Sequence, residues 1–271
     1  MTTFLKKKLK IIFIFASQRR INIIFMSKTL ILIPSRLAAK RLPRKPLLKI
    51  GGKSLIYHVY KKAKESKIGD VFVATGDKEI YNDIIDNGGK CILTKTLHKS
   101  GTDRIYEAFK KLKIKKVKYV LNIQGDEPLI NKNDIVNLNK IAVKNKLDFC
   151  TLGSLIDKKK IHSNKNIVKV ETINKLKKNN YLLAKNFFRK KKLNKYVNIY
   201  HHIGIYHYSV SALKKFQSFK QTKNEKKYKL EQLRAMDNKM SVNVVLANSS
   251  PIGVDTLKEY KKVKLLMERN S

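Results

Sequence analysis

From Thr29 onward the sequence alternates short apolar runs with amphipathic segments, and this alternation limits the possible folds more than any other feature. The runs "TLILIP", "DVFVAT" and "KCILT" are almost continuously apolar, which is typical of strands covered on both faces. Between them, "SLIYHVYKKAKES" and "KEIYNDIIDNG" place apolar residues at helical spacing. Strands alternating with helices predict βαβ units. We therefore expect an α/β fold of three layers, with a mainly parallel central sheet.

The second half of the chain, from about Asp148, is less regular. "FCTLGSLI", "NIVKVETI" and "YHHIGIYHYSV" are expected strands, and "TLKEYKKVKLLMER" is an expected closing helix. We find no internal repeat and no linker rich in Pro, Gly and Ser. Residues 26–271 are therefore predicted to form one domain, which is long enough to bury a sizeable core.

The N-terminal stretch "MTTFLKKKLKIIFIFASQRRINIIFM" has an apolar core that is too short for a secretory signal. No apolar run approaches the roughly 20 residues of a membrane span. Met26 is an alternative start, and residues 1–25 are expected to be an extension outside the fold. Cys91 and Cys150 form no CxxC pair, as is typical of reduced cysteines in a cytosolic protein.

The net charge of +41 allows a nucleic-acid partner as one interpretation. The lysines, however, are spread over the whole chain together with many isoleucines and asparagines. No basic surface interleaved with aromatic residues is evident. We therefore favour a solvated lysine-rich surface and expect no nucleic-acid partner.

Basic side chains gather directly after the first expected strand, in "PSRLAAKRLPRKPL". In parallel sheets, ligands bind beyond the carboxyl ends of the strands. The chain has only nine arginines, and this loop contains Arg36, Arg41 and Lys45. Guanidinium groups fork around phosphate oxygens, so the loop is a candidate triphosphate cradle, although GxxxxGK[ST] and GxGxxG are absent. A surface basic loop is the alternative.

Carboxylates follow a later strand in "NIQGDEPLI", where Asp126 and Glu127 are aimed beyond the sheet edge. Hard oxygen ligands suit Mg²⁺ that carries a phosphate-rich substrate, although an acidic turn is the alternative. Asp255, in "PIGVDT", precedes the last expected helix. It is either the N-cap of that helix or the partner of Asp126 in a two-carboxylate metal site, and sequence spacing leaves both open.

Six motifs occur in order between Thr29 and the last helix: "IPSRLAAKRLPRKPL", "HKSGTDR", "NIQGDEPLI", "HIGIYHY", "LEQLRA" and "GVDT". Together they make the chain resemble the 3-deoxy-manno-octulosonate cytidylyltransferases, or CMP-Kdo synthetases. The resemblance implies a Rossmann-like nucleotidyltransferase fold. It also implies that the anomeric hydroxyl of 3-deoxy-manno-octulosonate (Kdo) attacks the α-phosphate of CTP, giving CMP-Kdo and pyrophosphate for lipopolysaccharide synthesis. Mg²⁺ as cofactor, a cytoplasmic homodimer and no membrane insertion are further implications.

The resemblance also assigns residues to roles. It implies catalytic roles for Arg36, Arg41, Lys45, Asp126 and Asp255. The implied metal ligands are Asp126 and Asp255. It implies nucleotide contacts at Pro34, Ser35, Arg36, Lys45, Ser100, Gly101, Arg104 and Gln124. The implied sugar contacts are Lys185, His202, Tyr206, Glu231 and Gln232. Without the resemblance, His202 and Tyr206 could equally be core residues of a strand.

Three positions depart from the family pattern. His201 replaces an arginine, Gly76 replaces a commoner aspartate, and the arginine near the sugar carboxylate is aligned with Lys185 in "YLLAKN". Lysine keeps the charge but loses the bidentate fork, so weaker sugar affinity is expected. A cytidylyltransferase for N-acylneuraminate is the nearest alternative, but "HIGIYHY" and "LEQLRA" favour the octulosonate branch. A basic nucleic-acid-binding protein is the remote alternative.

Overall fold

The computed structural model describes residues 29–38, 41–156, 167–190 and 198–269. The strands are β1 (Thr29–Ser35), β2 (Lys49–Ile50), β3 (Lys53–Ser54), β4 (Val71–Thr75), β5 (Cys91–Leu93), β6 (Tyr119–Asn122), β7 (Phe149–Ser154), β8 (Lys169–Thr172), β9 (Tyr181–Phe188), β10 (Asn198–Ser209) and β11 (Asn243–Ala247). The helices are α2 (Leu55–Glu65), α3 (Lys78–Asp86), α4 (Gly101–Leu112), α5 (Lys132–Lys144), α7 (Val210–Ser218), α8 (Lys223–Tyr228), α9 (Leu233–Asp237), α10 (Leu257–Glu268) and the 3₁₀ turn η1 (Lys45–Leu47). The predicted extension, residues 1–25, lies outside the described residues, so the division into extension and domain stays a prediction.

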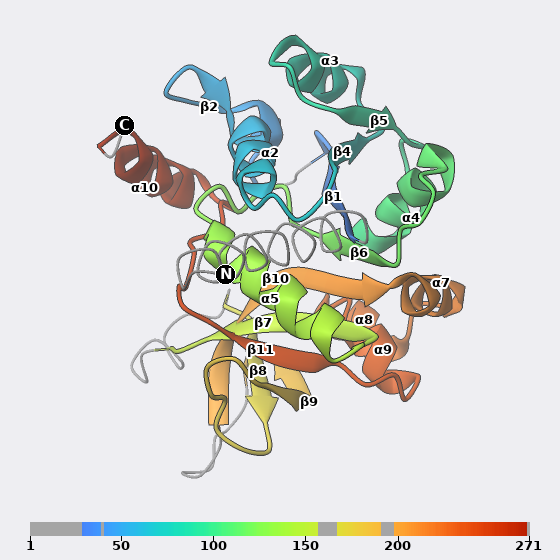
Figure 1. The fold of residues 1–271 in the computed structure, drawn as a ribbon. Helices are drawn as coiled ribbons and strands as arrows, with labels where there is room; N and C mark the ends of the chain where they lie inside the picture. The colour runs from blue at the N-terminus through green and yellow to red at the C-terminus, as the bar shows by residue number, and fades with distance from the viewer. Residues whose placement is uncertain (1–28, 39–40, 157–166, 191–197, 270–271) are drawn as a thin grey trace, which may run out of the picture.

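One sheet of nine strands runs through the described chain in the order β5-β4-β1-β6-β10-β7-β11-β9-β8 (Figure 1). The first four are parallel, as predicted. Beyond them the sheet is mixed: β7 and β11 are parallel, whereas β10 is antiparallel to both β6 and β7, and β9 is antiparallel to β8 and β11. For β8 and β9 the reason is local, because they follow each other without a crossover helix, and parallel pairing needs such a crossover.

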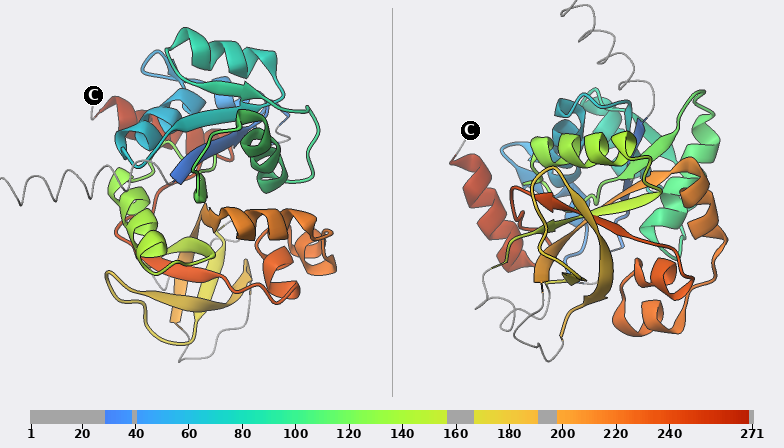
Figure 2. Two further views of the ribbon diagram at one scale, coloured as in Figure 1. Left: turned by 45° about the vertical axis from the view of Figure 1, so that its right-hand side comes forward. Right: turned by 60° about the horizontal axis from the view of Figure 1, so that its bottom comes forward.

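The second half of the sheet closes on itself. The amino-terminal part of β10 also pairs with β8, so β10, β7, β11, β9 and β8 form a small barrel. Figure 2 shows these strands curling around one another at the end of the molecule opposite β5. A Cβ atom at Gly153 of β7 would lie 3.0 Å from Val244 and 3.1 Å from Tyr200, so the narrow barrel interior favours glycine there.

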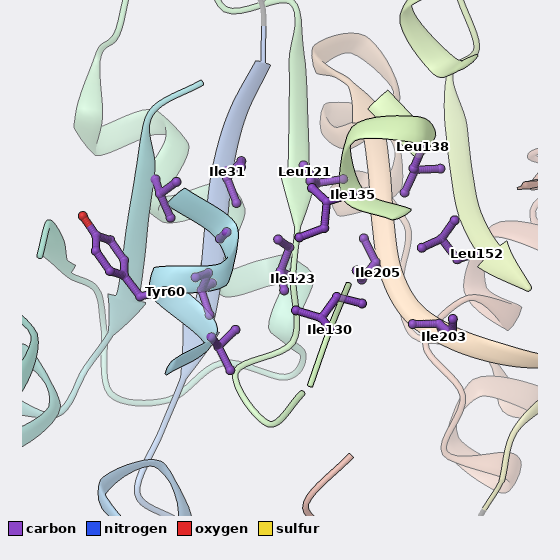
Figure 3. Packing of buried hydrophobic residues seen from close by; sticks show 14 of the residues in the cluster. Ile31, Tyr60, Leu121, Ile123, Ile130, Ile135, Leu138, Leu152, Ile203 and Ile205 are labelled. Atoms are coloured by element: carbon purple, nitrogen blue, oxygen red, sulfur yellow. The ribbon is translucent and has the colours of Figure 1, made fainter. Parts of the chain in front are cut away.

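Helices cover both faces of the sheet, which confirms the predicted three layers. In β1, Ile31 and Ile33 face the cluster that contains α2, α3, α5 and α10, whereas Leu30 and Leu32 face the cluster that contains α4, α7 and α9. This alternation explains why the strand is apolar at every position. Figure 3 shows the first cluster, with Ile31 and the neighbouring strands packed under α2 and α5.

The parallel half of the sheet sets the position of the site. Leu32 of β1 lies opposite Asn122 of β6, and the amide of Ile123 donates to the carbonyl of Leu32 at 3.1 Å. The loops after these two strands therefore leave the same edge of the sheet. Among the helices of the described residues, none combines the length and the apolar character needed to cross a membrane.

Candidate active site

A cleft of about 850 Å³ opens at this carboxyl edge of the sheet. All of the residues predicted as catalytic or nucleotide-binding line it. They are Pro34, Ser35, Arg36, Arg41, Lys45, Ser100, Gly101, Arg104, Gln124, Asp126 and Asp255. His98 and Lys229, which the sequence analysis did not assign, also line the cleft. The fold thus brings together side chains that are more than 200 positions apart in the sequence.

The basic loop after β1 is held in place by acids of the β4–α3 region. The backbone amide of Leu37 donates to Asp77 Oδ2 at 3.0 Å, and the Arg44 guanidinium pairs with both carboxylate oxygens of Glu79. Arg44 has a left-handed backbone (φ 56°) and is followed by η1, which begins at Lys45. This turn directs Lys45 back into the cleft, where its side chain is 13% exposed.

Lys45 lies between the two predicted metal ligands. Its Nζ atom is 2.8 Å from Asp126 Oδ2 and 3.1 Å from Asp255 Oδ1, and Arg41 Nη2 is 2.9 Å from Asp255 Oδ2. Burial opposes the charge of Lys45, but the two carboxylates outweigh burial and raise its pKa. The geometry resolves the alternatives for Asp255, because its side chain faces the cleft beside Asp126.

The backbone keeps these two carboxylates close together. The amide of Val254 donates to the carbonyl of Asp126 at 2.9 Å, which joins the loop before α10 to the loop after β6. The N-cap of α10 is Thr256, which forms a capping box with Glu259, and not Asp255. Glu259 also accepts from the backbone amide of Asp255 at 2.9 Å. The Asp255 carboxylate is therefore not used as a helix cap.

Gly125, just before Asp126, is required by close packing. A Cβ atom there would lie 2.9 Å from Ile56 and 3.0 Å from the carbonyl oxygen of Pro34. The adjacent Glu127 turns inward, and the backbone of Gly204 hydrogen-bonds it. Burial and the charge of Asp126 raise the pKa of Glu127 to about 8.

No group of three or more His, Cys, Asp and Glu side chains suited to a metal occurs within the described ranges. The two cleft carboxylates nevertheless have oxygens that approach one ammonium group within 2.8 and 3.1 Å. Such converging hard oxygens fit a divalent cation whose remaining ligands come from phosphate and water, which is how Mg²⁺ is usually held. The donor set therefore fits the predicted metal.

Arg104 lines the cleft, but its guanidinium hydrogen-bonds other groups of the protein. Its guanidinium donates to the side chain of Thr94 at 2.7 Å and to the carbonyls of Lys95 and Thr96 at 3.0 Å. The same segment approaches Gly76 so closely that a Cβ atom there would be 2.5 Å from the Cα of Thr96. The departure at Gly76 therefore matches the path of this loop, which leaves no space for an aspartate.

Most residues predicted to bind the sugar form a wall of buried and mostly uncharged groups. His202 Nε2 is 2.9 Å from the Thr151 hydroxyl, and burial lowers the pKa of His202 to about 3. Tyr206 donates to Gln232 Oε1 at 3.0 Å, and the Glu231 carboxylate accepts from the backbone amide of Thr102 at 3.2 Å. The structure thus joins His202, Tyr206, Gln232 and Glu231 into one region beside α4.

Lys185 is not among the residues that line the cleft. Its side chain is 61% exposed and its ammonium pairs with Glu171 of β8 at 3.1 Å. Arg189 lies within electrostatic reach of Asp255 and Arg41, and burial lowers its pKa. It also lines a second cavity of about 720 Å³ with Phe188 and Leu233.

Arg189, four residues after Lys185, was not among the predicted sugar contacts. In "NFFRK" it directly follows the end of β9, after two buried phenylalanines, Phe187 and Phe188. A charged residue at the point where a strand leaves the core is the sequence pattern that points to Arg189. The histidine that replaces the family arginine, His201, is bonded through Nδ1 to the Ser250 hydroxyl at 2.6 Å, and burial lowers its pKa to about 4.

Comparisons with known proteins identify the family. The family model described as "Cytidylyltransferase" matches residues 30–242. A 3-deoxy-manno-octulosonate cytidylyltransferase of Bartonella bacilliformis is 38% identical over 241 residues, which cover 89% of this chain and 98% of the relative. The chain belongs to the 3-deoxy-manno-octulosonate cytidylyltransferase family. A relative of the same name from Rhodopseudomonas palustris is 40% identical, over 84% of this chain and 93% of its own length.

Solved structures give the same result for the fold. A CMP:2-keto-3-deoxy-manno-octonic acid synthetase complexed with CTP is 32% identical, with a TM-score of 0.80 over 90% of this chain and all of the other. A UDP-glucose pyrophosphorylase, 13% identical, has a TM-score of 0.68 over 90% of this chain and all of the other, and supports the fold alone. These neighbours confirm the predicted nucleotidyltransferase fold.

Proposed function

We propose that this protein is a CMP-Kdo synthetase, which transfers CMP from CTP to Kdo and releases pyrophosphate. The observation that carries the proposal is the convergence of Lys45, Arg41, Asp126 and Asp255 at one point of the cleft. Cations for a triphosphate and carboxylates for a metal meet there at the carboxyl edge of the sheet. The relatives that bear this enzyme's name match over nearly their whole length.

The basic side chains of the cleft would bind the triphosphate. Arg36 and Arg41 are exposed at its mouth, where their guanidinium groups can each contact two phosphate oxygens. Lys45 is held more deeply by the two carboxylates. Fixed cations that face a reacting phosphate stabilise the charge that develops during phosphoryl transfer, and they are the main source of rate in such enzymes.

Asp126 and Asp255 would hold Mg²⁺, because their oxygens converge and because hard carboxylate oxygens suit this ion. When bound, the ion would neutralise charge on the triphosphate and favour ionisation of a hydroxyl group. Lys45 and Arg41 contact these same carboxylates, so they lie where a phosphate held beside the metal would meet them.

The sugar would lie against the wall formed by His202, Tyr206 and Gln232, whose groups donate or accept hydrogen bonds without carrying net charge. A polyhydroxylated acid requires many such directed bonds. Arg189 would bind the sugar carboxylate, since a guanidinium contacts a carboxylate through two parallel bonds. This role replaces the one expected for Lys185.

The decisive experiment measures pyrophosphate release from the purified protein with CTP, Mg²⁺ and Kdo, beside the same mixture with N-acetylneuraminate. We expect release with Kdo alone. Release only with N-acetylneuraminate would keep the chemistry and change the sugar. If neither sugar supports release while the protein binds RNA or DNA in a salt-sensitive manner, the proposal is wrong and the basic surface has the functional role.

Two further properties complete the proposal. We expect the protein to act in the cytoplasm, because it draws on the CTP pool, and to do so as a homodimer. Light scattering on the eluting protein during gel filtration measures the mass directly, and a mass of one chain at micromolar concentration would contradict the dimer.

A further inference from the structure

A buried charged cluster lies between the start of α4 and the α8–α9 region. Arg234 of α9 is 1% exposed. Its Nε and Nη2 atoms donate to the two oxygens of Glu225 at 2.8 and 2.6 Å, and its Nη1 atom donates to Asp103 Oδ1 at 3.2 Å. The guanidinium carbon also lies 4.7 Å from the centre of the Phe216 ring. One side chain therefore connects α9 both to α8 and to the first turn of α4.

Glu231 forms a second connection between the same two segments. Its Oε1 atom accepts from the backbone amide of Thr102, and the hydroxyls of Ser100 and Thr102 also bond the carboxylate. The Ser100 hydroxyl accepts from the amide of Asp103 at 3.1 Å, as the N-cap of α4. Asp103 and Arg234 belong to the motifs "HKSGTDR" and "LEQLRA". Neither residue is a proposed contact of CTP, of Kdo or of the metal.

The segment 231–234 faces both parts of the proposed active site. On one side, it touches the turn of Ser100 and Gly101, which line the nucleotide cleft. On the other side, Gln232 accepts from Tyr206. The Nε2 group of Gln232 is buried, and among the described residues it has no hydrogen-bond partner. A buried donor without a partner is unfavourable unless a ligand completes it, so Gln232 is set to meet a polar substrate group.

Stability alone gives a weak reason for this cluster, because buried ion pairs are often no more stabilising than apolar residues of the same volume. The geometry of the cluster gives a better reason for its presence. Helix α4 has 12 residues, packs on β1, and is also held by the contacts of Arg104. Helix α9 has only five residues, so its position depends on contacts with its neighbours.

We propose that Arg234 is a positioning residue: through Asp103 it holds the sugar-facing segment 231–234 in register with the nucleotide-facing turn of α4. The inference rests on the proposed function, since it concerns the sugar of that reaction. Loss of the contact displaces the shorter element, α9, and with it the donor of Gln232. The nucleotide side of the cleft remains in place because α4 has its own contacts with the sheet.

The test compares Asp103→Ala, the conservative Asp103→Asn and Arg234→Lys with the wild type in the pyrophosphate assay. For Asp103→Ala we expect the KM for Kdo to rise roughly tenfold, the effect of losing one hydrogen bond to a charged group, while the KM for CTP changes less than about twofold. Asp103→Asn keeps an acceptor oxygen and should restore part of the affinity. The Asp103 variants leave the Arg234–Glu225 pair intact, so they keep the test decisive if Arg234→Lys folds poorly.

Asp70→Asn is the matched control, since it removes an exposed carboxylate that pairs with Lys90 outside the cleft. A fall in the melting temperature with both KM values unchanged would show a merely structural brace and overturn the positioning role. An equal rise in both KM values would also overturn it. If the wild type releases no pyrophosphate with Kdo, the proposed function fails and this inference fails with it. If the wild type is active and only the variants contradict expectation, this inference alone fails, so the two failures are distinguishable.

Discussion

The two halves of the site use opposite kinds of side chain. In the nucleotide cleft, charged groups remain partly exposed and pair with one another, as Lys45, Asp126, Asp255 and Arg41 do. In the sugar wall, polar groups are buried and mostly neutral, as His202 and Tyr206 are. The difference matches the proposed ligands: a triphosphate with its metal would be recognised by charge, and a sugar by directed hydrogen bonds.

Removing a cleft carboxylate should have the largest effect on activity. Asp126→Asn should lower kcat/KM roughly a thousandfold, because it weakens the metal site and leaves Lys45 with one partner fewer. Pyrophosphate release measures this, with Asp70→Asn as the control and a melting curve to verify folding. Activity within tenfold of wild type in the Asp126 variant would contradict a metal role for this carboxylate.

Substitution of Arg189 tests whether this residue belongs to the sugar side of the site. Arg189→Ala should raise the KM for Kdo roughly 10- to 100-fold, through the loss of hydrogen bonds to a carboxylate, with a smaller effect on CTP. The paired control is Lys185→Ala, which removes an exposed charge directed toward Glu171 and should leave both KM values within about twofold. Should the two variants exchange these effects, the original alignment on Lys185 would be correct.

Two buried histidines of β10 predict a pH dependence of stability. Burial lowers the pKa of both His202 and His207 to about 3, whereas an unfolded histidine titrates near 6.5. Below pH 6.5 the unfolded chain takes up protons that the folded chain does not, so stability falls as pH falls. Two such histidines give a slope of roughly 3 kcal/mol per pH unit at pH values clearly below 6. Urea unfolding at several pH values measures this slope, and His207→Gln should reduce it. A slope in the variant equal to that of the wild type would contradict a neutral His207.

The smallest expected effect concerns the two cysteines, one in each half of the sheet. Burial raises the pKa of Cys91 to about 12, and burial also raises the pKa of Cys150. Both thiols should therefore react slowly with a disulfide reagent at pH 8 in the folded protein. Cys91 lies on the edge strand β5 and Cys150 on the central strand β7, so Cys91 should react first. The reverse order, followed by mass spectrometry, would show that the barrel half opens more readily.

The parallel half was predictable because its signals are local. A strand buried on both faces is apolar at each position, as in Leu30–Ile33, and the loops after β1, β5 and β6 each contain the polar residues of one motif. The barrel half was not predictable in the same way, since β10 pairs with β6, β7 and β8, and no local pattern specifies three partners. The sequence cannot choose between Lys185 in β9 and Arg189 just after it for the same reason: without the pairing, an extended segment offers no fixed register.

The sequence by itself determined the layered α/β class, the family and the residues of the nucleotide cleft, because these depend on periodicity and on motifs of adjacent residues. Only the tertiary structure decided that Asp255 faces Asp126 beside Lys45, that Lys185 pairs with Glu171, and that Arg234 joins α9 to α4. Each of these facts is a contact between residues far apart in the chain. Such contacts depend on how strands pair and helices pack, which the spacing of residues along the chain does not encode.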